Sequence, residues 1–429
     1  MHCIVRLFCF AACFAILGGT PAADAQLRGH GGPVRALAVS SDGTTLLSGS
    51  FDTAAIRWSL TRNTAEQVLR FHAGAVNAVV FLADGRSVTG GADSRIAIWT
   101  SDKQTPDRVL DGHTGPVASL AASPDGRLLA SASWDGTVRL WPLRGGPPKI
   151  LEGRGQNVNA VAFLRDGKTA ISAGYDGAVR FWSWGDAATP LVVTLPAALN
   201  AVAIAPTGEI AAAGADGKVY LLSPQGAVLA SESVAARALT ALAISGDGTL
   251  IAAANIGGVT IIDRAAREPP RLLAAAAGPI WAVAFLPGQH IVLTGGGDGV
   301  IRRWNADTGA SLDGDTGGAQ ADPLAAYAGD PGAQIFRACI ACHTLKSGEG
   351  ERAGPSLHGI FGRRIATLPG YAYSDALKHL DIVWTPNTIA KLFELGPTTY
   401  TPGTKMPEQR IGNPEDRAAL VEFLERATR

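Results

Sequence analysis

Residues 112–142 read GHTGPVASLAASPDGRLLASASWDGTVRLWP, and this stretch contains the pattern that decides the fold of most of the chain. An apolar run starts at Val117, a turn ends at Gly126, and a later apolar run ends at Trp141, six residues after Asp135. Short apolar runs separated by Asp-Gly pairs are typical of strands joined by tight hairpins, where glycine tolerates positive φ. The stretch therefore predicts a small antiparallel sheet.

The same layout occurs seven times along the chain. The first strands begin at Val34, Val76, Val117, Val158, Leu199, Leu239 and Ile280, which gives intervals of 42, 41, 41, 41, 40 and 40 residues. The following turns end in Gly43, Gly85, Gly126, Gly167, Gly208, Gly248 and Gly288, and the third strands end in Trp58, Trp99, Trp141, Trp182, Leu222, Ile262 and Trp304. A period near 41 with about four short strands per unit is typical of a β-propeller, because each sheet buries its faces only against neighbouring blades. We expect an all-β, seven-bladed propeller over residues 26–313.

The repeats resemble the WD-repeat family of propellers over about 27–313. Gly29-His30 and Gly112-His113 match the Gly-His pair of that family, and His72 stands in the same position. The resemblance weakens in the fifth and sixth repeats, which lack both this pair and the tryptophan. It implies that the histidine, the turn aspartate and the tryptophan form a structural hydrogen-bond network, so a metal site there is not expected. His290 is the other propeller histidine and is expected to be surface or core filler.

The propeller shows no catalytic constellation in its sequence, so its expected role is to present a rigid surface to a protein partner. Either end of the propeller could supply the strand that closes the ring. Leu27-Arg28 could do so from the N-terminal side and Leu312 from the C-terminal side. The pattern does not choose between them.

The first 25 residues are predicted to be a signal peptide. Arg6 precedes an apolar run of 12 residues from Leu7 to Gly18, and Ala23-Asp24-Ala25 offers small residues at the two positions that a signal peptidase reads. Twelve residues are too few to span a bilayer, so we expect a periplasmic protein without a transmembrane span in the mature chain. An uncleaved anchor is the alternative; a lipoprotein through Cys13 is disfavoured because that cysteine lies inside the apolar run.

The amino-acid composition argues against two classes of protein, nucleic-acid binders and disordered chains. The chain has 429 residues, with 37 Lys+Arg and 37 Asp+Glu, and the formal charge is zero. The absence of a basic excess or stripe argues against nucleic-acid binding. Charged residues make up 17% and hydrophobic residues 47%, which excludes a disordered chain.

Beyond the signal peptide, the cysteines that remain are Cys339 and Cys342, followed directly by His343. Asp330-Pro331 predicts the start of a helix, and on a helix these three side chains lie on one face. Such an arrangement can bond two vinyl carbons of a haem and place an imidazole on its iron. Cys-x-x-Cys-His is the attachment signal for c-type haem, with a thioredoxin-like redox pair as the alternative. We expect one covalently bound haem c.

Met406 is the candidate for the sixth iron ligand. It is the only methionine after the signal peptide and follows His343 by 63 residues, among turn-forming residues. A thioether suits haem iron, and His/Met ligation raises the reduction potential. The alternative is that Met406 fills the core.

Residues 354–359 read GPSLHG and are followed by Phe361-Gly362-Arg363. Through this stretch, among others, the segment 324–429 resembles class I cytochrome c, an all-α domain. Residues 314–323 have the composition of a flexible linker. The resemblance implies that the Pro355 carbonyl accepts the ring N–H of His343 and that Tyr373 and Trp384 donate to the haem propionates. It also implies that Asn413 caps a last helix packed on the first. Phe393 departs from the family, which often has a tyrosine there. The segment has 12 basic and 11 acidic residues, so it lacks a strongly basic face.

These observations favour an exported, non-enzymatic electron-transfer protein. The haem would carry one electron, and the propeller would dock a redox partner protein or assembly. One alternative is a redox enzyme whose propeller binds a substrate or second cofactor and whose haem is the electron outlet. Another is a haem-based sensor or peroxidase, which needs an open iron site.

Overall fold

The computed structural model describes most of the chain after the predicted signal peptide. The described residues are 26–103, 105–152, 156–183, 189–265, 269–273, 279–313, 324–327, 329–336, 339–340, 343–348, 354–371, 373–404, 406, 411 and 413–429. The predicted signal peptide (1–25), the predicted linker (314–323) and Cys342 lie outside them.

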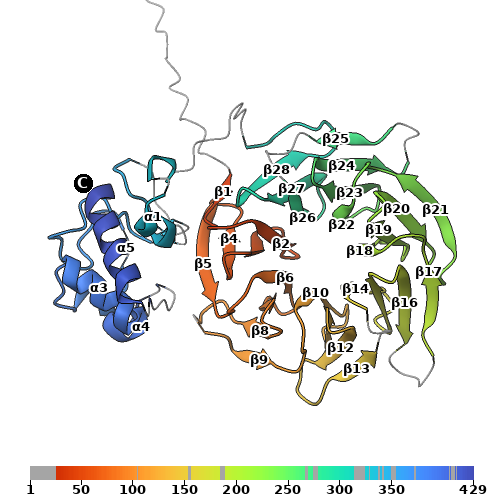
Figure 1. The fold of residues 1–429 in the computed structure, drawn as a ribbon, viewed down its shortest axis with the longest axis horizontal. Coiled ribbons are helices and arrows are strands. Elements are labelled where there is room, and N and C mark those ends of the chain that lie inside the picture. Colours follow the sequence, from red (N-terminus) through yellow and green to blue (C-terminus); the bar gives the residue numbers. More distant parts are fainter. Residues whose placement is uncertain are drawn as a thin grey trace, which may run out of the picture.

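The described part of the N-terminal region forms seven four-stranded antiparallel sheets arranged around a central channel (Figure 1). Blade 1 contains β2 (Val34–Val39), β3 (Thr45–Ser50), β4 (Ala54–Ser59) and β5 (Thr64–Arg70). Blade 2 contains β6 (Val76–Phe81), β7 (Ser87–Gly91), β8 (Ile96–Trp99) and β9 (Arg108–Leu110). Blade 3 contains β10 (Val117–Ala122), β11 (Leu128–Ser133), β12 (Thr137–Pro142) and β13 (Lys149–Glu152). Blade 4 contains β14 (Val158–Phe163), β15 (Thr169–Gly174), β16 (Ala178–Ser183) and β17 (Leu191–Thr194).

The remaining blades follow the same order, with the first strand at the channel and the fourth at the rim (Figure 1). Blade 5 contains β18 (Leu199–Ile204), β19 (Ile210–Gly214), β20 (Lys218–Leu222) and β21 (Val228–Ser233). Blade 6 contains β22 (Leu239–Ile244), β23 (Leu250–Asn255), β24 (Gly258–Asp263) and β25 (Arg271–Leu273). Blade 7 contains β26 (Ile280–Phe285), β27 (Ile291–Gly296), β28 (Val300–Asn305) and β1 (Leu27–Arg28). The seven predicted first strands are thus confirmed, each beginning at the residue that the repeat indicated.

The N-terminal side closes the ring. β1 pairs with β28, with Leu27 opposite Ile301 and Arg28 opposite Val300. Leu27 is buried in a core cluster that also contains Trp58 of blade 1, so this short strand joins the last blade to the first. Ser311 makes only an isolated bridge to Trp304.

The predicted histidine networks are present in blades 1, 2 and 3. In blade 1, His30 donates from Nδ1 to Asp52 at 3.0 Å, while Nε2 lies 2.7 Å from the Ser48 hydroxyl. Trp58 Nε1 donates to the same hydroxyl at 2.8 Å. Thr89 and Ser131 take the place of Ser48 in blades 2 and 3. The bridging hydroxyl was not predicted from the sequence, although it connects the histidine to the tryptophan in each network.

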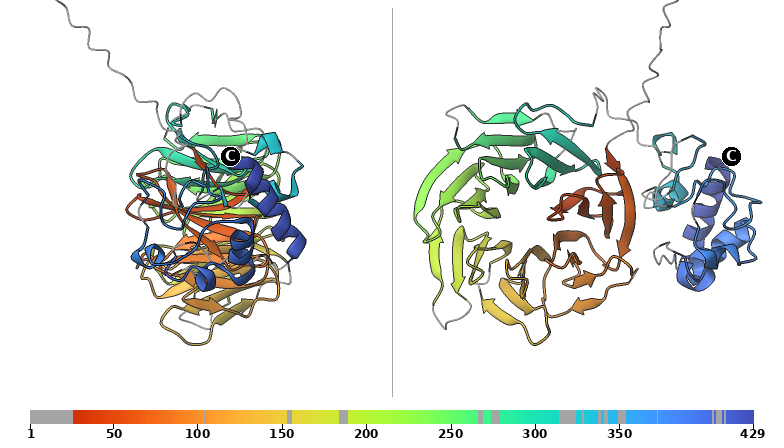
Figure 2. Two further views of the ribbon diagram at one scale, coloured as in Figure 1. Left: turned by 90° about the vertical axis from the view of Figure 1, so that its left-hand side faces the viewer. Right: turned by 180° about the vertical axis from the view of Figure 1, so that it is seen from behind.

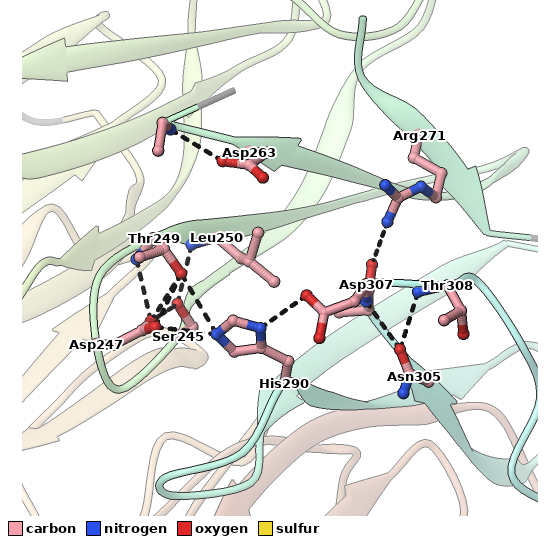
Figure 3. A network of polar contacts seen from close by, with 12 residues as sticks. Ser245, Asp247, Thr249, Leu250, Asp263, Arg271, His290, Asn305, Asp307 and Thr308 are labelled. Carbon is pink, nitrogen blue, oxygen red and sulfur yellow. Dashed lines mark hydrogen bonds and ion pairs between the residues drawn. The ribbon is translucent and has the colours of Figure 1, made fainter. Parts of the chain in front are cut away.

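His290 joins two blades (Figure 3). It lies in the turn before β27 of blade 7, and its Nε2 is 2.9 Å from Asp247 in the turn before β23 of blade 6. Its Nδ1 is 2.7 Å from Asp307, after β28. The hydrogen bonds that the ring donates to these two carboxylates raise the pKa of His290. His290 is therefore part of a polar contact between blades rather than filler.

The C-terminal region is small and helical (Figure 2). Its elements are η1 (Ala325–Tyr327), α1 (Pro331–Phe336), α2 (Asp375–Lys378), α3 (Pro386–Leu395), α4 (Pro397–Tyr400) and α5 (Pro414–Ala427). Asp330 caps α1 by accepting the Gly332 and Ala333 amides at 2.8 and 3.2 Å. Asn413 caps α5 by accepting the Glu415 amide at 2.9 Å. Both predicted caps are confirmed.

Helices α1 and α5 cross in close contact. The rings of Phe336 and Phe423 lie 5.4 Å apart, and Leu420 and Leu424 join the same core. A Cβ on Gly332 would lie 2.1 Å from the Ala419 backbone oxygen, so only glycine permits this approach. Among the described helices, none is long and apolar enough to cross a membrane.

Candidate haem site

Cys339 and His343 lie on one helical turn after α1. The His343 amide donates to the Cys339 carbonyl at 3.0 Å, as in a helix. The structure describes α1 up to Phe336, and residues 337–338, between α1 and Cys339, lie outside the described residues, so the predicted continuity of this helix stays a prediction. The turn nevertheless directs the thiol and the imidazole into one cavity. Cys342, the second predicted attachment residue, lies outside the described residues.

Pro355 orients the imidazole as predicted. His343 donates from Nδ1 to the Pro355 backbone oxygen at 2.7 Å. With Nδ1 protonated and occupied, Nε2 is the ring nitrogen that is able to bind a metal. The hydrogen bond thereby sets both the tautomer and the direction of the ring.

Met406 reaches the same cavity from the loop after α4. Its amide donates to the Thr404 hydroxyl at 3.0 Å, and the Thr404 amide donates to the Thr401 carbonyl at 3.1 Å. Thr401 is buried, with its hydroxyl bonded to the Pro397 carbonyl of α4 at 2.9 Å. The loop is thus held by a chain of local hydrogen bonds, and Met406 is presented by a turn rather than by a helix face.

Every described residue of the predicted site lines this one cavity: Cys339, His343, Pro355, Tyr373, Trp384 and Met406. Phe393, which stands where the family often has a tyrosine, lines it too. The remaining wall is mostly apolar and includes Phe336, Leu357, Ile360, Ile389 and Leu392. His358 and His379 are exposed and are not among the residues that line the cavity.

Arg363 adds a cation that sequence reasoning did not single out. Its guanidinium lines the cavity and donates to the Ser356 carbonyl at 2.8 Å and to the His358 carbonyl at 3.1 Å. Burial lowers the pKa of Arg363 and raises the pKa of Tyr373, which lies nearby. A guanidinium and a phenol hydroxyl that lie close together can both donate hydrogen bonds to one carboxylate. Arg363 stands two residues after Phe361, in the stretch that resembles class I cytochrome c. That resemblance was the sequence feature from which its role could have been predicted.

The donor set of the cavity fits a c-type haem. It combines an apolar wall with a thiol, an imidazole whose Nδ1 is bonded to Pro355, a thioether, and the Arg363, Tyr373 and Trp384 donors for carboxylates. Burial raises the pKa of the Cys339 thiol to about 11, and the charge of Arg70, on β5 of the propeller, counteracts this in part. Because burial disfavours the charged thiolate, this position is better suited to a cysteine held in a permanent thioether bond than to a reactive cysteine.

Comparison with known protein families gives matches in both the propeller and the helical region. The family model described as "Cytochrome c" matches residues 329–428. The model described as "WD domain, G-beta repeat" matches residues 24–59, 63–100, 104–142, 145–183 and 268–305. These stretches correspond to blades 1–4 and 7, the repeats in which the motif is strongest.

Curated relatives match through about a quarter of the chain. The cytochrome c of Cochliobolus lunatus is 46% identical over 99 residues, which are 23% of this chain and 91% of the relative. That of Arabidopsis thaliana is 46% identical over 99 residues, covering 23% and 88%. That of Ulva intestinalis is 43% identical over 103 residues, covering 23% and 92%.

Fold and site together define a WD40-repeat propeller followed by a small helical haem protein. Through this second domain the chain belongs to the cytochrome c family. The domain binds haem c covalently and serves haem-based electron transfer.

Proposed function

We propose that the protein is an exported, monohaem electron carrier in which His343 and Met406 hold the iron and Cys339 and Cys342 hold the haem vinyl carbons. The observation that carries this proposal is the 2.7 Å hydrogen bond from His343 Nδ1 to Pro355, with Met406 in the same cavity. A neutral imidazole directed by its second nitrogen and a thioether are the ligand pair of an electron-transfer haem.

The bound haem supplies one-electron chemistry, and the chain supplies its environment. Leu357, Ile360 and Leu392 line the cavity with apolar surface, which would keep water from the bound haem. Arg363 and Tyr373 offer donors to the propionate carboxylates, which need partners when buried. Met406 would occupy the sixth position, so that small molecules are kept from the iron and a carrier is favoured over a sensor or peroxidase.

The test is an absorption spectrum of the purified holoprotein, ferric and ferrous, with and without carbon monoxide. We expect a low-spin spectrum with a methionine-to-iron band in the ferric state and no response of the ferrous state to carbon monoxide. Met406→Ala should lose the band and bind carbon monoxide. Ready binding by the unmodified protein would contradict the proposal, and a second chromophore would favour a redox enzyme.

We further propose that one face of the propeller docks the redox partner. Four large side chains that each directly follow the second strand of a blade are exposed: Phe51 (48%), Trp134 (44%), Tyr175 (49%) and Ile256 (46%). Because the second strands of all blades end at the same face, these side chains share it. Large exposed side chains that share one face, three of them aromatic here, support protein binding, and we call this the aromatic face.

Arg35 gives this face a charge preference. It is the second residue of β2 at the channel, and its guanidinium lies 5.7 Å from the centre of the Trp281 ring. Within the described part of the chain, Arg35 forms no ion pair with a carboxylate, and burial lowers its pKa. A partner with an acidic segment flanked by apolar side chains would complement both features.

The docking proposal is tested with Trp134→Ala and Tyr175→Ala. The rate of haem reduction is measured with fractions of an extract from the exporting cell. The fractions that reduce the unmodified protein should reduce these two variants more slowly. The matched control is Leu229→Ala on the rim strand β21, where Leu229 is 53% exposed. Equal reduction rates for all three variants would contradict docking through this face.

Export rests on the sequence of residues 1–25. The apolar run and the small residues before Gln26 support cleavage there. N-terminal sequencing of the protein recovered from periplasm should begin at Gln26. An intact N-terminus in the purified protein would contradict cleavage.

A further inference from the structure

The haem cavity has a wall that the helical domain does not supply. Besides residues of that domain, the cavity is lined by Glu66, Gln67 and Val68, which are consecutive residues of β5. Figures 1 and 2 both show the helical domain beside the outer strand of blade 1. Arg70, at the end of the same strand, is close enough to Cys339 for its charge to act on the thiol.

β5 differs in burial from rim strands elsewhere in the propeller. Ala65, Gln67, Val68 and Leu69 are buried in β5, whereas every residue of β21 in blade 5 is exposed. Val68 and Leu69 pack into the blade cores. Gln67 is polar and only 6% exposed: its side-chain amide donates to the Lys103 carbonyl between β8 and β9, and the residue also lines the cavity. The outer edge of blade 1 is therefore covered where that of blade 5 is open.

The strand also brings a carboxylate to the cavity. Glu66 Oε1 accepts from Arg62 Nη2 at 2.5 Å, and Oε2 lies 3.8 Å from Arg57 Nε. Its side chain retains 31% exposure. These two arginines hold the carboxylate in place beside the cavity, and Glu66 offsets part of their positive charge there. Without the Glu66 carboxylate, the charge beside the cavity would be more positive.

We propose that blade 1 completes the haem site: β5 docks against the cavity through Glu66–Val68, and the Glu66 carboxylate stabilises the ferric state. A fixed negative charge beside a haem favours the oxidised form, because reduction removes one positive charge from the centre. The docked blade also closes this side of the cavity to a partner protein. The aromatic face described above remains free, since it lies around the channel and not on the rim.

This inference rests on haem binding in the cavity, which the carbon monoxide spectrum tests separately. The contact is tested with the full holoprotein carrying one fluorophore whose emission overlaps haem absorption. Thr61→Cys places it in the turn before β5, and Gln225→Cys places it in the equivalent turn before β21; both native residues are exposed. We expect the fluorescence lifetime at position 61 to be at least severalfold shorter than that at position 225. Equal lifetimes would overturn the docking.

The charge is tested by potentiometric titration of Glu66→Gln. We expect a ferrous-to-ferric ratio about three- to tenfold higher at a fixed potential, as for removal of one nearby charge. Glu232→Gln, on the exposed strand β21, is the matched control and should leave the ratio unchanged. A ratio in Glu66→Gln equal to that of the control would overturn the electrostatic role.

Discussion

The imidazole of His343 is fixed by the backbone of Pro355, whose carbonyl oxygen lies 2.7 Å from Nδ1. Because the acceptor is a carbonyl rather than a side chain, the nitrogen must carry the proton. The loop that supplies the carbonyl is itself held by Arg363, which binds the carbonyls of Ser356 and His358. The orientation of the ring therefore depends on a residue that also faces the cavity.

A protected ring proton on His343 is the first prediction. In the diamagnetic ferrous protein, NMR should show the Nδ1 proton exchanging slowly with solvent and close to Pro355. Arg363→Met should make this exchange at least about tenfold faster, because losing two hydrogen bonds of about 1.5–3 kcal/mol each loosens the loop. An Nδ1 proton that exchanges equally fast in both proteins would contradict this.

The bridging hydroxyl of Ser48 should matter more than its counterpart in blade 4. Ser48→Ala removes the partner of both His30 Nε2 and Trp58 Nε1. Ser172 has one of these partners, Trp182 Nε1. Leaving buried groups unpaired costs about 1–3 kcal/mol each, so Ser48→Ala should lower the free energy of unfolding more than Ser172→Ala. Denaturant unfolding of both variants is the measurement; equal losses would show that His30 contributes nothing through this bond.

Gly332 is predicted to be irreplaceable in the crossing of α1 and α5. Gly332→Ala would bring a methyl group to 2.1 Å from the Ala419 oxygen and 2.5 Å from the Phe423 Cβ. Overpacking of this kind costs about 1–3 kcal/mol or more. Gly246→Ala is the control, because its Cβ would meet nothing closer than 3.5 Å. Thermal unfolding is followed through the haem absorption. The midpoint temperature should be lower for Gly332→Ala than for the unmodified protein, and it should be unchanged for Gly246→Ala.

The stability of the contact between blades 6 and 7 should fall as the solution becomes alkaline. Hydrogen bonds to Asp247 and Asp307 raise the pKa of His290 above its ordinary value of 6.5. Its contribution to stability is then complete below pH 6.5 and is lost as the pH rises through the raised pKa. Asp247 has a lowered pKa, so its contribution is present above its ordinary value of 3.8 and is lost in acid.

Unfolding midpoints at pH 5.5 and 8.5 test this for the intact protein and for His290→Gln. The intact protein should lose more stability between the two pH values than the variant does. The difference should be small and should shrink with added salt, because these groups are partly exposed to solvent. Identical pH profiles would show that His290 does not contribute.

Much of the fold could be predicted because the repeat has a fixed period. The first strands of all seven blades begin where Val34, Ile280 and their counterparts indicated, since each strand start is set by a local pattern of apolar residues and turn glycines. The closing strand β1 could not be chosen, because two residues are too short for a pattern. The network hydroxyls, such as Ser48, were also missed, since small polar residues are common in these strands.

In the haem site, residues that belong to short motifs were predicted and those defined by tertiary position were not. Cys339, His343 and Met406 followed from spacing and chemistry, and Pro355 from the family stretch. Arg363 stood in that stretch, but its direction depends on how the loop folds. Glu66 could not be predicted, because its place beside the cavity depends on how two separately folding domains meet.

The pairing of β1 with β28 also has a consequence for the order of folding. Leu27 must meet Ile301, so the ring can close only after nearly all of the propeller has been synthesised. Contacts so distant along the chain form slowly, because a large loop has to be ordered first. In the cytochrome domain, the contact between α1 and α5 closes a shorter loop than the pairing of Leu27 with Ile301 does. The helical domain can therefore fold around the attachment cysteines before β1 has paired with β28.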